Sequence, residues 1–405
     1  MIKKVKVDDL RPGVFITDFG RKWFKHPFIT NKVRIKNYAM IEKIRRSGIQ
    51  EVFIDTTRGL DVIEHFNYNE IRKYFSSADQ QFAEDLNKPK PTPLFKELPQ
   101  AKIIRQEAYN VIKNLSAHVK TGRPIDLKVV TPVVDDVLES VSRNQDALMT
   151  LLTIKNRDQY TYMHSVNVSV LMAVLLKSMY FPPEKIKDLT TGAFLHDIGK
   201  SQIPIYIINK TAPLTSKEFE IMKRHAEIGL KLLEKTEDIS QDIKDIVYQH
   251  HERLDGLGYP KGLTEKEISF GAKATAICDI YDAMTNDRSY SNARSSSDVL
   301  RYLFELGQQN ILDFELVQKF IHAVGVYPIG TLVRLNSGFL GFVVETNKHD
   351  PLRPVVRLVY DTRHNMPIPS RDLDLASTVG HLHEIVDTES PLEWNIKPDE
   401  FLKAS

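Results

Sequence analysis

The chain has 405 residues, an apolar fraction of 42% and a formal net charge of +2. This length predicts two or three domains, and the near-neutral charge gives no long-range attraction to nucleic acid or to an acidic membrane. The single cysteine, Cys278, excludes an internal disulfide and favours a reducing compartment. The start, Met1 to Leu10, lacks the apolar core of a signal peptide, and the longest apolar run, Val168 to Leu176, is far shorter than a membrane span. We therefore expect a soluble cytoplasmic protein that binds neither nucleic acid nor a membrane.

Residues 1–75 are predicted to form a small α+β domain. Short strands are expected at 14–16 and 52–54, and a helix at 37–47 that Gly48 ends. No set of catalytic residue types occurs here, so we expect a regulatory or dimerising domain. The polar stretch 76–100 carries Pro89, Pro91, Pro93 and Pro99, which is typical of a linker.

Residues 101–324 are predicted to be almost entirely helical. Thr215 and Glu218 have the spacing of a capping box at a helix start. An apolar-periodic run that includes Leu189 and Phe194 predicts a helix just ahead of His196, and Gly199 is expected to end that helix at its C′ position.

After Gly325 the pattern changes to that of strands. Residues 331–335 and 341–344 flank Asn336-Ser337-Gly338 and predict a hairpin, and 355–359 predicts another strand. The predicted fold class is therefore mainly α. It comprises an all-helical domain, a small α+β N-terminal domain and a β-rich tail, 325–405, that packs on or extends the helical domain.

Five histidines and two aspartates fall on apolar helix faces or at buried helix ends of the helical region. They are His164, His196, Asp197, His225, His250, His251 and Asp279. A lone histidine on such a face is more often a hydrogen-bonded core residue, but seven polar residues in one core would need seven separate arrangements. One metal centre would satisfy all of them. Seven ligands are too many for one four-coordinate ion, so we expect two metals, with Asp197 able to bridge them.

Such a paired metal site is suited to phosphoryl chemistry. Two metals about 3.5–4 Å apart can hold a bridging hydroxide and stabilise the oxygens of an in-line displacement at phosphorus. Lys200 follows Asp197 closely and Arg288 follows Asp279, so both are candidates to contact a phosphate. The alternative for each is an ordinary surface cation.

These residues resemble an HD-GYP domain, the branch of the HD phosphohydrolase superfamily that hydrolyses cyclic dinucleotides. The resemblance covers about residues 140–325, and residues 1–75 resemble the small domain of unknown function often found ahead of it. Its motifs are Tyr160-Thr161-Tyr162-Met163-His164-Ser165, His196-Asp197-Ile198-Gly199-Lys200, Leu214-Thr215 through His225, His250-His251-Glu252-Arg253-Leu254-Asp255-Gly256-Leu257-Gly258-Tyr259-Pro260, Asp279-Ile280-Tyr281-Asp282-Ala283-Met284-Thr285 and Asp287-Arg288-Ser289-Tyr290. The His-His run joined to Gly-Tyr-Pro is the most specific of them.

The resemblance implies two divalent ions, iron or manganese. One would be bound by His164, His196, Asp197 and Asp279, and the other by Asp197, His225, His250 and His251. Lys200 and Arg288 would contact the phosphates. Asp255, Gly256, Gly258, Tyr259 and Pro260 would form a loop at the rim, where Tyr259 could stack on a base. In the alternative interpretation this loop is a structural turn; the family also links it to protein–protein contacts.

The sequence departs from the family pattern at two positions. Some members carry a glutamate four residues before the first histidine, where it can join a third metal, but this chain has Tyr160. We therefore predict a binuclear site. Many members carry Lys or Arg where this chain has Ser291, and its absence is expected to weaken substrate affinity or slow a second hydrolysis step.

We predict a metal-dependent phosphodiesterase that cuts cyclic di-GMP to the linear dinucleotide; a second cut, if it follows, would give GMP. Asp197 and Lys200 are the predicted catalytic residues, and Asp282 is expected to orient the metal ligands. Two alternatives are an enzyme for mixed cyclic GMP–AMP and a non-catalytic cyclic-dinucleotide sensor or scaffold. A homodimer is expected from the regulatory N-terminal domain.

Overall fold

A computed structural model gives the architecture of the chain. It describes residues 2–7, 10, 14–19, 32–35, 40, 44, 47–56, 58, 92–152, 160–210, 212–286, 294–347, 350, 352–389, 391, 393–396 and 401. The chain divides into two compact units, Met1–Gln80 and Gln81–Ser405.

The N-terminal unit contains an antiparallel four-stranded sheet in the order β1-β4-β2-β3. The strands are β1 (Ile2–Lys6), β2 (Phe15–Asp18), β3 (Val33–Arg34) and β4 (Glu51–Asp55). Alternate residues of β4, Val52 and Ile54, are buried in a separate apolar core, as the period of two in a strand requires. The predicted helix at 37–47 lies mostly outside the described residues; Met40 and Ile44 are helical and Gly48 has a φ of +71°.

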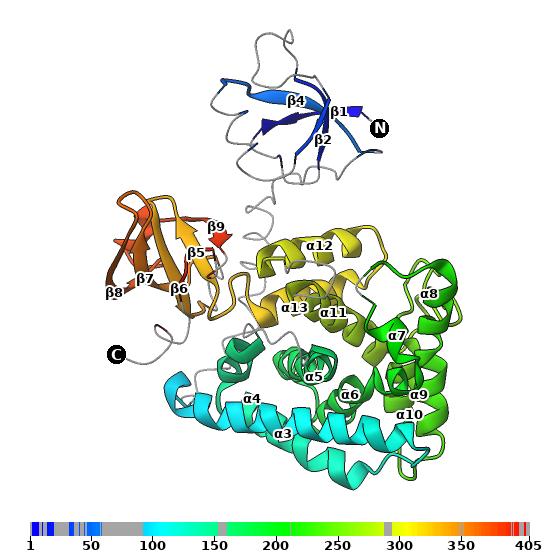
Figure 1. Ribbon diagram of the computed structural model, residues 1–405. Coiled ribbons are helices and arrows are strands. Elements are labelled where there is room, and N and C mark those ends of the chain that lie inside the picture. Colours follow the sequence, from blue (N-terminus) through cyan, green and yellow to red (C-terminus); the bar gives the residue numbers. More distant parts are fainter. Residues whose placement is uncertain are drawn as a thin grey trace. The chain divides into compact units, whose positions relative to one another are not determined.

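The second unit is dominated by a bundle of helices (Figure 1). They are α3 (Leu94–Lys120), α4 (Leu127–Leu152), α5 (Tyr160–Ser178), α6 (Pro183–Leu195), the 3-10 helix η6 (Ile198–Gln202), α7 (Ile205–Ile208), α8 (Ser216–Lys223), α9 (His225–Leu233), α10 (Gln241–Gln249), α11 (Phe270–Thr285), α12 (Ser296–Gln308) and α13 (Phe314–Val324). Helix α5 is the central one, because its residues 163–176 are all buried. A helix that is apolar on every side must be surrounded by others.

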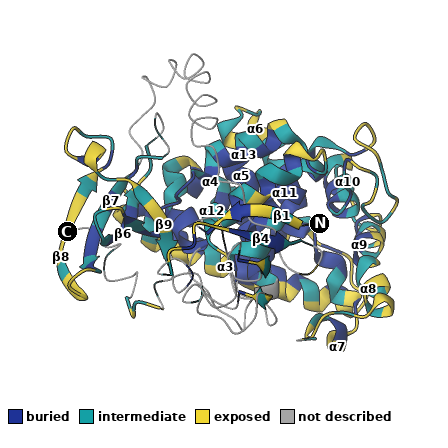
Figure 2. Cartoon of the chain, turned by 90° about the horizontal axis from the view of Figure 1, so that it is seen from above, coloured by how far each residue is buried: buried dark blue, intermediate teal, exposed yellow. Residues whose placement is uncertain are grey.

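The outer helices are amphipathic, and Figure 2 shows their buried residues facing the inside of the bundle. One apolar core joins α3, α4, α5, α6, η6, α9 and α10, and includes Ile112, Val134 and Phe194. The capping box predicted at Thr215 and Glu218 is present at the start of α8. No described helix combines the length and the apolar character needed to cross a membrane.

The structure corrects the end of the predicted linker. Helix α3 begins at Leu94, so residues 94–100 are helical although Pro99 lies among them. The reason is burial of Glu97, whose carboxylate accepts hydrogen bonds from Ser140 and Arg143 of α4 at 2.8–3.0 Å. A buried carboxylate with a paired guanidinium holds this end of α3 against α4.

The residues after α13 form an antiparallel five-stranded sheet in the order β8-β7-β6-β5-β9. The strands are β5 (Leu332–Leu335), β6 (Phe339–Glu345), β7 (Val355–Asp361), β8 (Met366–Asp374) and β9 (Ile385–Glu389), with the short 3-10 helix η7 (Gly380–Leu382) before β9. The predicted hairpin is β5–β6, in which Val333 pairs with Gly341. The predicted fold class, mainly α with small β-containing parts at both ends, is confirmed.

Candidate metal centre

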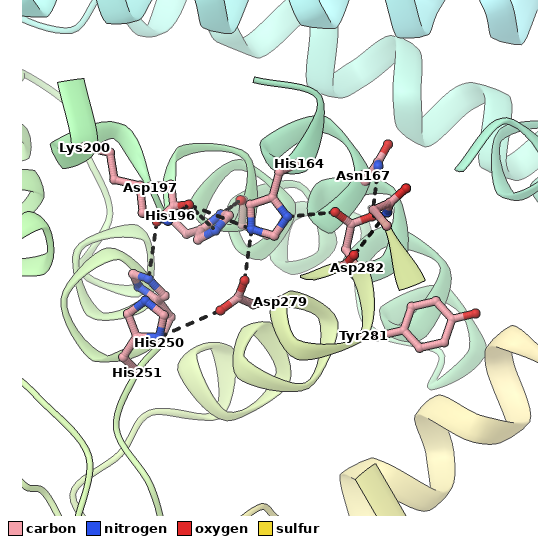
Figure 3. A network of polar contacts seen from close by, with 12 residues as sticks. His164, Asn167, His196, Asp197, Lys200, His250, His251, Asp279, Tyr281 and Asp282 are labelled. Atoms are coloured by element: carbon pink, nitrogen blue, oxygen red, sulfur yellow. Dashed lines mark hydrogen bonds and ion pairs between the residues drawn. The ribbon is translucent and has the colours of Figure 1, made fainter. Parts of the chain in front are cut away.

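All seven residues predicted to be metal ligands lie in one cluster, and six of them are labelled in Figure 3. Five helices supply them, mostly at their ends. His164 is in the first turns of α5, and Asp279 is in α11. His196 caps the end of α6 and Asp197 follows it, His225 opens α9, and His250 caps the end of α10 with His251 next.

The carboxylate of Asp197 lies at the middle of the cluster. Its Oδ1 is 3.4 Å from Nε2 of His225 and 3.8 Å from Nε2 of His250. Its Oδ2 is 3.3 Å from Nε2 of His196 and 3.8 Å from Nε2 of His164. The two oxygens therefore face two different pairs of histidines, which is the geometry of a carboxylate able to serve two ions.

The described residues contain two groups whose ligand atoms all lie within 4.8 Å of one another. One is Asp197, His225, His250 and His251, and the other is His164, His196 and Asp197. Asp279 belongs to neither group. Its Oδ1 is 2.9 Å from Nε2 of His164 and its Oδ2 is 3.8 Å from Nδ1 of His251, so its carboxylate lies between the two groups.

The outer ring nitrogens of three histidines are held by backbone carbonyl acceptors. The Nδ1 atoms of His196 and His225 donate to the carbonyls of Ala193 and Met222, both at 2.7 Å. His250 donates in the same way within α10, at 3.1 Å to Val247. These bonds fix the tautomer that leaves a lone pair on each Nε2, directed toward Asp197.

The inner atoms lack partners that a protein core ordinarily provides. Nε2 of His196 and Oδ1 of Asp197 are buried and have no hydrogen-bond partner. Nε2 of His225 and Nε2 of His250 face each other at 3.3 Å, although each has its proton on the other nitrogen. Lone pairs and a carboxylate that converge in a buried place fit a divalent cation of the transition series.

Electrostatics favour the forms that bind a metal. Burial lowers the pKa of His225 to about 4 and that of His251 to about 3, so both are neutral at pH 7. Burial alone would raise the pKa of Asp197, but the nearby positive charge of Lys200 holds it well below its usual range. The site thus presents the neutral imidazoles of His225 and His251 together with an ionised carboxylate.

His164 is oriented by a second carboxylate, Asp282, as the sequence analysis expected. Its Nδ1 donates to Asp282 Oδ2 at 2.7 Å, and the side-chain amides of Asn167 and Asn286 each donate to Oδ1 at 2.8 Å. Burial would lower the pKa of His164, but Asp279 and Asp282 raise it to about 9. The sequence patterns did not predict a role for these two asparagines. Their spacing, three residues after His164 and four residues after Asp282, places each on the same helix face as the residue it supports.

Lys200 lies beside the cluster. Its Nζ is 2.5 Å from Oδ2 of Asp197, and a quarter of its side chain is exposed. The expectation that Gly199 ends α6 at its C′ position is wrong, because α6 ends at Leu195 and Gly199 lies inside η6. The Cα of Gly199 instead packs closely against α9, because a Cβ added to Gly199 would lie 2.0 Å from the carbonyl oxygen of His225. Glycine there permits η6 and α9 to approach each other.

The loop after His251 packs around Glu252, a residue that the sequence analysis did not select. Its buried carboxylate accepts backbone N–H bonds from Lys261, Gly262 and Leu263 at 2.7–3.2 Å. An added Cβ on Gly258 would lie 2.5 Å from the Glu252 backbone, so this glycine also permits a close approach. The carboxylate of Asp255 is exposed and bound to Arg253 and the N–H of Leu257.

The ring of Tyr259, followed by a cis peptide bond to Pro260, covers His251. The two ring centroids are 4.6 Å apart and the rings are tilted by 31°. Burial, with Asp279 and Asp197, raises the pKa of Tyr259 above its ordinary value, so the phenol keeps its proton. The predicted contact residue Arg288, and Ser291, lie outside the described residues, as does the side chain of Tyr160.

Three family models match the chain in succession. They are a domain of unknown function, DUF3391, over residues 2–130, an HD domain over residues 132–316, and a KOW domain associated with HD domains over residues 332–379. The last match gives the tail a relationship that the sequence analysis lacked.

Several curated cyclic-dinucleotide phosphodiesterases are similar to this chain in sequence. A cyclic di-GMP phosphodiesterase of Pseudomonas aeruginosa is 33% identical over 98% of this chain and 94% of its own length. A cyclic di-GMP phosphodiesterase of Thermotoga maritima is 35% identical over 45% of this chain and 51% of its own length. A 3′3′-cGAMP-specific phosphodiesterase of Vibrio cholerae is 35% identical over 34% of this chain and 27% of its own length.

Proposed function

This chain belongs to the HD-GYP branch of the HD domain family, and we propose that it is a metal-dependent phosphodiesterase that hydrolyses cyclic di-GMP. The observation that supports this most directly is the carboxylate of Asp197, with its two oxygens between two pairs of histidines whose lone pairs point inward. The Pseudomonas relative, which matches along nearly the whole chain, supports the choice of substrate.

The proposed centre holds two divalent ions, iron or manganese. His164, His196, Asp197 and Asp279 bind one, and Asp197, His225, His250 and His251 bind the other. The ions would supply Lewis acidity at the phosphate and lower the pKa of water. Imidazoles from buried helix ends and ionised carboxylates suit both metals. The placement of Asp279 supports its assignment, since one of its oxygens already contacts His164.

The surrounding side chains bind and orient the substrate. Lys200, now paired with Asp197, is close enough to turn its ammonium group to a phosphate oxygen once the carboxylate has other partners. Arg288 is proposed as the second phosphate contact. The rim loop that carries Asp255, Gly258 and Tyr259 stands next to His251, so Tyr259 limits access of water on that side. Asp282 holds the ring of His164 in place.

The test is hydrolysis of cyclic di-GMP by protein loaded anaerobically with Fe(II) or Mn(II), with products separated by chromatography. We expect the linear dinucleotide, and GMP if a second cut follows, and no product from Asp197→Ala. Mixed cyclic GMP–AMP is offered in parallel to decide between the two substrates. If both metal forms bind cyclic di-GMP tightly but neither hydrolyses it, the proposed enzymatic activity is contradicted and a cyclic-dinucleotide sensor is favoured.

The remaining parts of the chain are proposed to serve this centre. Residues 1–75 form a regulatory domain, 76–93 connect it to the helical catalytic region that ends at 324, and 325–405 form the tail. A homodimer, protein partners at the Gly-Tyr-Pro loop and a cytoplasmic location belong to the same proposal. The lone, buried Cys278 supports a reducing compartment.

A further inference from the structure

An aromatic side chain stands exposed beside the candidate metal centre. Phe219, on the two-turn surface helix α8, has 45% of its surface exposed. None of the residues of α8 is buried, so this ring does not anchor the helix to the core. Figure 1 shows α8 at the side of the bundle where α7, α9 and α10 meet.

A series of rings connects Phe219 with the histidine cluster. The rings of Phe219 and Tyr259 form a T-shaped pair with a centroid separation of 6.1 Å and an interplanar angle of 81°. Tyr259 in turn lies 4.6 Å from the ring of His251 and 6.3 Å from that of His225. The exposed ring of Phe219 is therefore one side chain further from the proposed metals than Tyr259.

A cation accompanies these rings. Lys223 lies four residues after Phe219, on the same face of α8. Its Nζ is 5.4 Å from the centroid of Phe219 and 6.0 Å from that of Tyr259. Its Nζ also lies 2.6 Å from Oε1 of Glu220, whose side chain is two-thirds exposed. A surface ion pair of this kind is weak, so Lys223 can exchange this partner for another.

We propose that Phe219 and Lys223 form a base-binding platform that receives one guanine of the substrate. This deepens the proposed function and rests on it. A base is separated from its phosphate by a ribose, so a phosphate near Lys200 and the metals would place its base toward the rim of the site. Aromatic side chains stack on bases of any kind, and an ammonium group donates to the O6 and N7 acceptors of guanine.

The lysine would give the platform its preference between bases. Adenine presents an N6 amino donor where guanine presents O6, so Lys223 opposes a donor rather than an acceptor when adenine occupies the platform. The pair thus separates two contributions: Phe219 provides affinity for any base, and Lys223 favours guanine. This would favour cyclic di-GMP over a cyclic dinucleotide that has no guanine, such as cyclic di-AMP.

The stacking role is tested with Phe219→Leu and Phe219→Trp in the full-length, metal-loaded protein. Leucine keeps an apolar side chain without a π-face, so we expect KM and Kd for cyclic di-GMP to rise about tenfold while kcat and metal content stay unchanged. Tryptophan should keep wild-type values. Phe95→Leu, which changes a similarly exposed phenylalanine on α3, is the matched control. Equal KM for Leu and wild type, or a fall in kcat alone, would overturn the role.

The specificity role is tested with Lys223→Gln, beside Lys231→Gln on α9 as control. We expect the preference for cyclic di-GMP over cyclic di-AMP, measured as the ratio of their Kd values, to fall about tenfold in the first variant only. An unchanged ratio would remove the assignment to Lys223. If the wild type binds but does not cleave cyclic di-GMP, the proposed function fails while Kd still tests the platform; a wild type that does neither overturns both.

Discussion

At the scale of single residues, the position of the ring of His164 depends on Asp282. The carboxylate of Asp282 accepts hydrogen bonds from His164 and from two asparagine amides. Of these three donors, only His164 belongs to the metal cluster. We expect Asp282→Ala to lower metal affinity by about 10- to 100-fold, because the ring and its tautomer are no longer fixed.

Isothermal titration of the metal-free variant with Mn(II) measures this effect. Asp242→Asn, which changes a carboxylate paired with Lys185 at the surface, is the control and should bind as the wild type does. Wild-type affinity in Asp282→Ala would show that packing alone holds His164.

The buried histidines make the metal-free protein sensitive to acid. The folded state holds His225 neutral, with its pKa lowered from 6.5 to about 4 by burial, whereas the unfolded chain takes up a proton near 6.5. The contribution of this histidine to stability is thus present above pH 6.5 and is lost as the pH falls toward 4. His164, whose pKa is raised to about 9, contributes fully below 6.5 and loses its contribution only as the pH rises, so it does not oppose this trend.

We expect the Tm of chelator-treated protein to fall between pH 6.5 and 4, and to fall less steeply in His225→Gln. Scanning calorimetry over this range measures both slopes. Identical slopes in the two proteins would contradict the assigned burial of a neutral His225.

At the scale of elements, the approach of η6 to α9 sets the distance between Asp197 and His225. Gly199 allows it, since a Cβ there would lie 2.0 Å from the His225 carbonyl oxygen and 2.7 Å from the Gly229 nitrogen. We expect Gly199→Ala to destabilise the protein by about 1–3 kcal/mol, because backbone must move to accept the methyl group. Metal content should also fall, since both ligands shift.

Gly122→Ala is the matched control for this substitution. Its Cβ would meet nothing within 4 Å, so only the left-handed φ of +83° opposes it. This variant should lose some stability but keep its metal, as thermal unfolding and metal analysis would show. Full metal content in Gly199→Ala would mean that the η6–α9 approach does not determine the site.

The same elements show what sequence patterns can predict. The capping box of α8, the hairpin β5–β6 and the helix before His196 follow from local residue types, and they appear where expected. The start of α3 depends instead on Glu97 meeting Arg143, a partner 46 residues away. The contribution of Gly199 likewise depends on a second helix. Contacts between distant segments decide both, and no local pattern contains them.

At the scale of the whole molecule, the seven candidate ligands come from five helices spread over more than a hundred residues. Their residue types and their positions on apolar faces allowed the set to be selected from the sequence. Their mutual distances, and the placement of Asp279 between two groups, required the packing of α5, α6, α9, α10 and α11. Glu252 escaped selection because a buried loop carboxylate has no periodic signature.

The most direct test of a binuclear centre bridged by Asp197 is the metal content of protein reconstituted anaerobically with Fe(II) or Mn(II), measured by atomic emission. Two groups of ligands around one carboxylate predict about two ions per chain in the wild type. His250→Ala should keep about one, and Asp197→Ala close to none. About three ions per wild-type chain, or two that persist without Asp197, would contradict the proposed centre.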